Sequence, residues 1–206
     1  MTLGVLGVVG IVGEHARSPD ASASSLAAST PAHLTLPSHG TYAFADGPPA
    51  RVTGGFGEDS CFACHWDGAE NEGPGELSVT GFPESIAAGE SHRITVRLTQ
   101  SEMEVAGFQM AVRLSNDTTQ AGALEVPEEE MERVRIIEER AILFAQHSLD
   151  GTELTSPGAA EWTVLWTPPP GEEASVLHIS AVAGDGDRSQ MGDHVYTLEL
   201  ESRPEK

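Results

Sequence analysis

The sequence predicts an all-β fold, an antiparallel immunoglobulin-like β-sandwich that follows an irregular N-terminal segment. From residue 76 onward, short runs alternate between apolar and polar residues, which is typical of strands with one buried face. The chain of 206 residues contains 22 Gly and 13 Pro, which predicts many turns between those strands. Short strands separated in this way favour two packed sheets within one domain.

Each expected strand is marked by apolar residues that lie two positions apart. In the third run, Gln109 and Arg113 lie on the face opposite Phe108. Three prolines, beginning at Pro168, end the run that contains Trp162 and Trp166. In chain order the apolar runs are Leu77 and Val79; Ile94, Val96 and Leu98; Phe108, Met110, Val112 and Leu114; residues 123–126; Trp162, Val164 and Trp166; residues 176–183; and residues 195–200.

One stretch, residues 128–141 (EEEMERVRIIEERA), fits two structures. As a charged helix it would place Met131, Val134 and Ile137 on one face. As a strand pair, Val134 and Ile136 alternate, residues 138–140 turn, and residues 142–148 return. We favour the strand pair because the neighbouring segments are strands.

The region before the sandwich is expected to contain three segments. Residues 3–13 (LGVLGVVGIVG) are an apolar run with the length of a signal-peptide core, too short to span a bilayer. No Lys or Arg precedes this run, so residues 1–23 are either a signal peptide or a retained N-terminal membrane anchor. We expect residues 24–45 to form an extended arm, residues 46–75 an irregular Gly- and Pro-rich segment, and residues 76–201 the sandwich.

The charge balance restricts the class of partner. Asp and Glu outnumber Lys and Arg by 32 to 11, which gives a formal net charge of −21. Nucleic acids and anionic membrane surfaces would repel such a chain. The charge suits docking onto a basic protein, and it equally suits an exported protein that needs only to stay in solution.

The irregular segment contains the most specific motif of the chain, Cys61-Phe62-Ala63-Cys64-His65. A C-x-x-C-H sequence is typical of covalent haem attachment. Two thiols at this spacing can each add to one vinyl group of a porphyrin, and the adjacent imidazole can then ligate the iron. Residues 46–75 are therefore predicted to attach one haem c through Cys61 and Cys64, with His65 as the proximal ligand. Trp66 is expected to pack on the haem edge.

Three other structures could use the same cysteines. A dithiol redox pair expects a βαβ context, which the surrounding sequence lacks. A zinc site would need two further ligands, and the chain has only two cysteines. A structural disulfide across so short a loop would constrain the unfolded chain very little.

With the motif and the strands in place, the chain resembles bacterial exported proteins that carry a reeler-like β-sandwich, also called choice-of-anchor domains. In that family a GPPA-x-x-TG segment leads into C-x-x-C-H, as residues 47–54 (GPPARVTG) lead into residues 61–65 here. The resemblance covers about residues 46–200 and implies an exported monohaem protein. The loop after Val126 is more acidic than the family pattern. Further matches are residues 106–108, 121–122, 147–148, Trp162, residues 166–169, Asp187, residues 192–193 and residues 196–197.

The resemblance also implies a distal iron ligand, because a histidine followed by Ser or Thr stands where His147 precedes Ser148. His147 is therefore predicted to bind the metal together with His65, or else to be a histidine at the edge of the core. Met191 and His194 are the next candidates. The others are expected in other roles: Met110 in the core, His92 exposed, His178 within the sandwich, and Asp185, Gly186, Asp187 and Asp193 in a solvated turn rather than a calcium loop.

These observations predict an exported monohaem c-type cytochrome that transfers electrons by an outer-sphere route, located in the periplasm or outside the cell, with membrane association if the N-terminal run is retained. Its partners would be redox proteins, of which a membrane-bound electron-transfer complex is one option, and not nucleic acid. No acid–base pair or nucleophile motif supports an enzyme. Two alternatives remain: an accessory docking subunit of a membrane-bound redox complex, and a haem-based sensor of small ligands with an open sixth position.

Overall fold

A computed structural model describes residues 44–87 and 89–205 of the chain. These residues form a β-sandwich of two sheets, as the alternation of apolar residues predicts. The expected signal peptide or anchor and nearly all of the expected arm lie outside the described residues. Within the described part, no helix has the length and apolar composition needed to cross a membrane.

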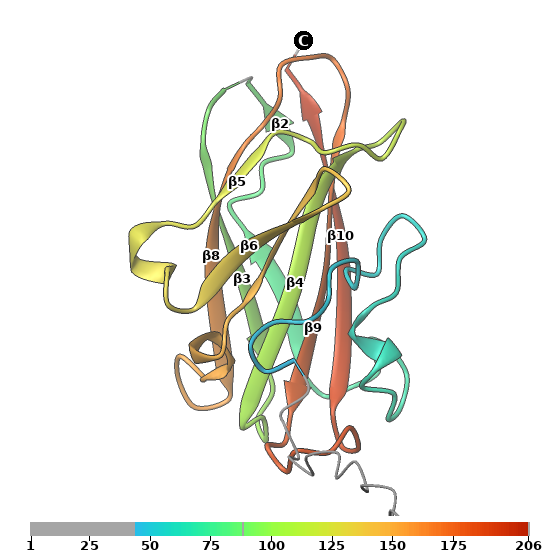
Figure 1. Cartoon of the computed structure of the whole chain (residues 1–206), viewed down its shortest axis with the longest axis vertical. Coiled ribbons are helices and arrows are strands. Elements are labelled where there is room, and N and C mark those ends of the chain that lie inside the picture. Colours follow the sequence, from blue (N-terminus) through green and yellow to red (C-terminus); the bar gives the residue numbers. More distant parts are fainter. Residues whose placement is uncertain (1–43, 88, 206) are drawn as a thin grey trace, which may run out of the picture. The chain divides into compact units, whose positions relative to one another are not determined.

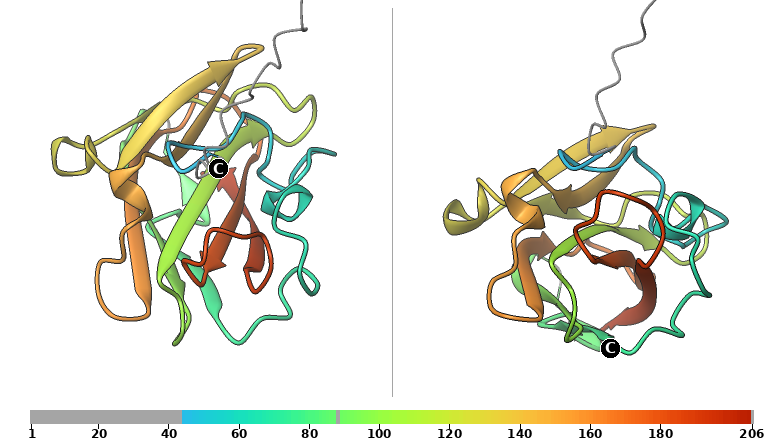
Figure 2. Two further views of the ribbon diagram at one scale, coloured as in Figure 1. Left: turned by 60° about the horizontal axis from the view of Figure 1, so that its bottom comes forward. Right: turned by 90° about the horizontal axis from the view of Figure 1, so that it is seen from below.

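The two sheets draw their strands from distant parts of the sequence, as Figures 1 and 2 show. One has the order β1-β3-β8-β5 and the other the order β2-β10-β9-β4-β7-β6. The strands are β1 (Glu76–Thr80), β2 (Ser85–Ile86), β3 (His92–Thr99), β4 (Val105–Leu114), β5 (Ala123–Glu125), β6 (Val134–Glu139), β7 (Ile142–His147), β8 (Ala159–Thr167), β9 (Ser175–Gly184) and β10 (His194–Pro204). Three short 3₁₀ helices are η1 (Cys61–Ala63), η2 (Glu128–Glu130) and η3 (Asp150–Thr152).

The pairing is antiparallel with one exception among the described strands. The two-residue strand β2 runs parallel to the end of β10, where Arg203 lies opposite Ser85. The strand β10 continues to Pro204, three residues beyond the predicted end of the sandwich at residue 201. The predicted antiparallel sandwich is confirmed, and β2, which adds the one parallel pair, is too short to show an alternating pattern in the sequence.

Alternation places the large apolar side chains of both sheets in one core. Phe108 on β4 stacks on Trp162 on β8, with ring centroids 4.6 Å apart. Both buried indoles have partners, as buried tryptophans require. The Trp162 indole N–H donates to the Gly151 carbonyl at 2.8 Å, and that of Trp166 donates to the Ala121 carbonyl at 2.9 Å. Met110 is fully buried in this core, as predicted.

The ambiguous stretch forms the predicted strand pair, β6 and β7, but the turn predicted at residues 138–140 was misplaced, because Glu138 and Glu139 still pair within β6. Glu139 pairs with Ile142, which leaves a two-residue turn of Arg140 and Ala141. Both turn residues have positive φ, 50° and 62°, the conformation that a tight hairpin turn of type I′ requires. The acidic residues before the hairpin form the short helix η2 rather than a long amphipathic helix.

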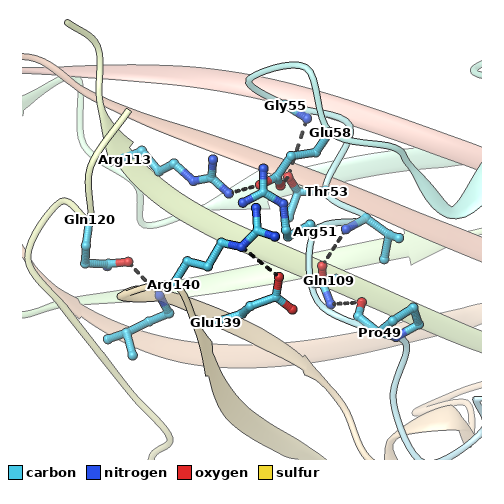
Figure 3. A network of polar contacts seen from close by, with 12 residues as sticks. Pro49, Arg51, Thr53, Gly55, Glu58, Gln109, Arg113, Gln120, Glu139 and Arg140 are labelled. Carbon is cyan, nitrogen blue, oxygen red and sulfur yellow. Dashed lines mark hydrogen bonds and ion pairs between the residues drawn. The ribbon is translucent and has the colours of Figure 1, made fainter. Parts of the chain in front are cut away.

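The irregular segment covers the outer face of the six-stranded sheet, the face turned away from the core (Figure 1). Gln109 and Arg113 lie opposite the core, as predicted, yet both are buried because this segment lies over them. The Gln109 side chain accepts from the Val52 N–H at 2.8 Å and donates to the Pro49 carbonyl at 2.9 Å. Figure 3 shows these contacts on β4.

A buried ion pair holds the same segment further along β4. The Arg113 guanidinium donates to the Glu58 carboxylate, which is fully excluded from solvent, and Arg51 lies 3.5 Å from the same carboxylate (Figure 3). The Thr53 hydroxyl donates to Glu58 at 3.0 Å. Because a buried charge needs several partners to offset its desolvation, these contacts fix the path of the chain just before the cysteine motif.

Candidate haem-binding site

The cysteine motif begins at a hydrogen bond to the sheet. The Cys61 N–H donates to the Ser180 hydroxyl of β9 at 3.0 Å, which fixes the start of η1. The Ser60 hydroxyl caps this helix by accepting from the Phe62 N–H at 3.1 Å. The N–H groups of Cys64 and His65 both donate to the Cys61 carbonyl. The motif is therefore a single tight turn held against the outer face of the sheet.

One cavity of about 880 Å³ brings the predicted site residues together. Its lining includes Cys61, Cys64, His65 and Trp66 from the motif and His147 from the end of β7. The cavity lies within the size range of pockets that bind cofactors, roughly 300–1,000 Å³. His147 lies some 80 residues after His65 in the sequence, yet it lines the same cavity as the motif, as the predicted site requires.

The rim of this cavity carries an unusual concentration of exposed apolar side chains. Of the five large apolar side chains that are exposed among the described residues, four line the cavity: Phe44, Trp66, Leu149 and Met191, each about half exposed. Solvent-exposed apolar surface gathered in one place is typical of a ligand or partner site. Trp66, which was predicted to pack on a haem edge, is one of these rim residues.

The proximal candidate His65 has a carboxylate partner that the sequence did not suggest. Its Nδ1 lies 2.5 Å from an Asp193 carboxylate oxygen. The Asp193 side chain is 5% exposed and that of His65 is 29% exposed. The prediction that Asp193 belongs to a solvated turn was wrong, whereas Asp185 and Asp187 of the same loop are exposed as expected. The pairing leaves Nε2 as the ring nitrogen available to a metal.

The distal candidate His147 is buried against the backbone of β4. Burial lowers the pKa of His147 below its usual 6.5, so the ring is neutral near pH 7 and its nitrogen can ligate a metal. Its Nδ1 lies 3.0 Å from the Phe108 nitrogen and 3.1 Å from the Phe108 oxygen. One backbone residue therefore offers this nitrogen both a donor and an acceptor. If Nδ1 carries the proton and donates to the carbonyl, Nε2 has a free lone pair.

Gly107 makes room for the His147 ring. A Cβ atom at position 107 would lie 2.7 Å from the His147 Cε1 atom, closer than side chains pack. On its other side, His147 Nε2 lies 3.3 Å from the Phe44 carbonyl oxygen. The ring is therefore held in one position by Gly107 and Phe108, with Nε2 turned toward the residue that begins the described chain.

The remaining ligand candidates are placed differently. Met191 lines the cavity on its exposed rim, whereas His194 does not line it and instead contacts Gln100, with 3.2 Å between the two side-chain nitrogens. His178 lies outside the cavity, 3.3 Å from Glu199. His92, predicted to be exposed, is half-buried, with its ring centroid 6.0 Å from that of Trp166.

The environment of Cys61 differs from that of a reactive dithiol. Both cysteines are free, and burial raises the pKa of Cys61 to about 11. Dithiol oxidoreductases lower the pKa of the attacking thiol, because the thiolate is the nucleophile. Among the described residues, no three His, Cys, Asp or Glu side chains gather as ligands for a bare metal ion. A haem iron needs only two protein ligands, one on each face.

Comparisons with known proteins concern the fold. No family model matches the chain, and no curated protein is similar to it. Among solved structures, the Reelin-N domain of F-spondin matches with 18% identity over 71% of this chain and 98% of its own length, at a TM-score of 0.46. The human F-spondin reeler domain matches with 18% identity over 66% of this chain and 92% of that domain, at 0.44. A cohesin module from Clostridium perfringens matches with 15% identity over 63% and 96%, also at 0.44.

Proposed function

We propose that this protein is an exported monohaem c-type cytochrome that carries single electrons between protein partners. One observation supports the proposal above the others. Both thiols of the C-x-x-C-H motif, the imidazole that follows them and a second neutral imidazole line one apolar cavity. That set of side chains is what covalent attachment and axial ligation of a haem require.

In this proposal, Cys61 and Cys64 hold the cofactor covalently. Each thiol would add across one vinyl double bond, with a carbon–sulfur bond formed and the thiol hydrogen taken up by the neighbouring carbon. The addition needs no oxidant or reductant. The position of Cys61 is already set by its N–H bond to Ser180. Burial keeps the Cys61 thiol protonated, so attachment is expected to require assistance from a dedicated system.

His65 and His147 are the residues that would hold the iron, each through Nε2. A bound haem would supply an iron that takes one electron from a reduced partner and gives it to an oxidised one. His65 is oriented by Asp193 through its other nitrogen, and His147 by Phe108. The apolar rim residues Phe44, Trp66, Leu149 and Met191 would limit access of water. The proposed partners are redox proteins with a basic docking surface, since the chain carries a net charge of −21.

The first test is a pyridine haemochrome spectrum with peroxidase staining of a denaturing gel. The protein is produced in a host that has a haem-attachment system. Haem that stays with the denatured chain is expected, and the variant Cys61→Ala plus Cys64→Ala should lose it. A colourless but folded wild-type chain would contradict the proposal.

A second candidate function is a haem-based sensor with an open sixth position. One observation favours it: His147 Nε2 lies 3.3 Å from the Phe44 carbonyl, a partner that competes with a metal for that nitrogen. A high-spin ferric spectrum of the wild-type protein, unchanged in His147→Ala, would support the sensor. A low-spin spectrum would support the electron carrier.

A further inference from the structure

We infer that Asp193 is a positioning residue for the proximal imidazole and holds the haem at a low reduction potential, an inference that rests on the proposed function. Asp193 ends the loop before β10, 128 residues from His65 in the chain, and its carboxylate lies 2.5 Å from His65 Nδ1. Metal-ligating histidines commonly donate their second ring N–H to a carboxylate, which fixes the ring and makes the ligating nitrogen more basic.

The burial of Asp193 gives this contact its strength. Its side chain is 5% exposed, so water screens the carboxylate very little. A hydrogen bond to a buried carboxylate is charge-assisted, and it gives the imidazole partial imidazolate character. A ligand with more negative charge stabilises ferric over ferrous iron, because the ferric ion carries one more positive charge.

The loop that carries the carboxylate is also joined to the motif segment. The N–H of the preceding residue, Gly192, donates to the Asp67 carboxylate at 2.8 Å, which joins this loop to the chain just after the motif. Gly184 leaves room for the second carboxylate oxygen, because a Cβ there would lie 3.1 Å from it. Figure 2 shows the loop between β9 and β10 (red) at the end of the sandwich nearest the viewer. The loop that carries Asp193 is therefore joined to the motif segment at Asp67 and lies close to the end of β9.

Among the described residues, no carboxylate is hydrogen-bonded to the distal imidazole, and the charges near it, Arg135 and Asp46, shift its pKa in opposite directions. The nearest partners of His147 Nδ1 are the backbone N–H and carbonyl of Phe108, both neutral. The two proposed axial imidazoles thus differ, with a strong donor at His65 and an ordinary neutral ligand at His147. We therefore expect removal of the Asp193 charge to change the reduction potential.

The test is the reduction potential of purified haem-loaded protein, measured by spectroscopic titration. Asp193→Asn keeps the shape of the side chain and removes its charge. The ferrous-to-ferric ratio at a given potential is expected to rise at least tenfold, which corresponds to an upward shift of about 59 mV for one electron. The control is Asp187→Asn, which removes the same charge from an exposed position of the same loop and is expected to shift the potential much less.

A second variant keeps the inference testable if Asp193→Asn does not fold. Asp67→Asn weakens the bond to Gly192 and loosens the loop while it leaves the Asp193 carboxylate in place, so the potential should rise by a smaller amount. An unchanged reduction potential in haem-loaded Asp193→Asn would overturn the inference. If only Asp67→Asn folds, an unchanged potential in that variant would do the same. Neither result would contradict the proposed cytochrome function. A wild-type chain that attaches no haem would overturn the proposed function instead.

Discussion

The six-stranded sheet excludes water on both faces by different means. On the inner face, alternating residues such as Phe108 and Met110 pack against the other sheet in an apolar core. On the outer face, Gln109 and Arg113 are equally buried, but under an irregular segment that they bind through hydrogen bonds and an ion pair. Apolar burial is non-directional and stabilises the sandwich, whereas polar contacts have fixed geometry and position a segment. The inner face thus supplies stability, and the outer face places the cysteine motif.

The largest expected effect comes from the inner face. Trp162→Ala should lower the free energy of unfolding by about 3–5 kcal/mol, because it removes a fully buried indole that stacks on Phe108. Urea unfolding followed by circular dichroism measures the loss. The matched control, Trp66→Ala in haem-free protein, removes a half-exposed indole and should change stability by roughly 0.5 kcal/mol or less. Equal losses in the two variants would contradict the assignment of the core.

On the outer face, Glu58→Gln should cost about 3 kcal/mol, because it leaves the buried Arg113 without its charged partner. It should also reduce haem attachment, since Glu58 holds the chain before Cys61. Chemical unfolding and the haem-to-protein ratio give the two readouts. Glu161→Gln breaks the exposed pair with Arg97 and should cost about 1 kcal/mol or less, with attachment unchanged. An attachment ratio at the wild-type level in Glu58→Gln would show that the outer face does not position the motif.

The third prediction concerns His147, which ends β7 and lines the cavity. His147→Ala should cost roughly 1–2 kcal/mol through lost hydrogen bonds and convert a low-spin ferric spectrum to high-spin. Absorption spectra of the ferric protein report the change. His178→Ala is the control, because His178 is also largely buried but lies outside the cavity, and its spectrum should match the wild type. A low-spin spectrum in both variants would remove His147 as a ligand.

The smallest expected effect is a pH dependence on the outer face. Burial lowers the pKa of His178 below its usual 6.5, partly offset by Glu199. Below pH 6.5 the unfolded chain therefore binds more protons at this residue than the folded chain, and stability falls as the pH is lowered toward the folded-state pKa. His178→Gln should reduce the loss of stability between pH 7 and pH 5 by up to about 1 kcal/mol. Unfolding curves at the two pH values test this, and an identical pH dependence in the variant would contradict it.

Most of the sandwich could be predicted from the sequence, because a period of two directly encodes which face of a strand is buried. The hairpin of β6 and β7 was also predicted, although its turn residues, Arg140 and Ala141, carry no glycine signal for positive φ. Cys61, Cys64 and His65 could be named as a site because the motif is local. His147 came from a family resemblance, since no local pattern distinguishes a ligand from a histidine at the edge of the core.

By itself, the sequence determined the all-β class and most of the strands, and it predicts the local chemistry of the cysteine motif, since each depends on neighbouring residues. Only the tertiary structure decided that the polar face of β4 is buried, because the covering segment lies some 60 residues earlier in the chain. The tertiary structure also revealed the contact between Asp193 and His65, which are 128 residues apart in the sequence. Contacts of that separation depend on how strands are ordered in space, and a one-dimensional pattern does not contain that order.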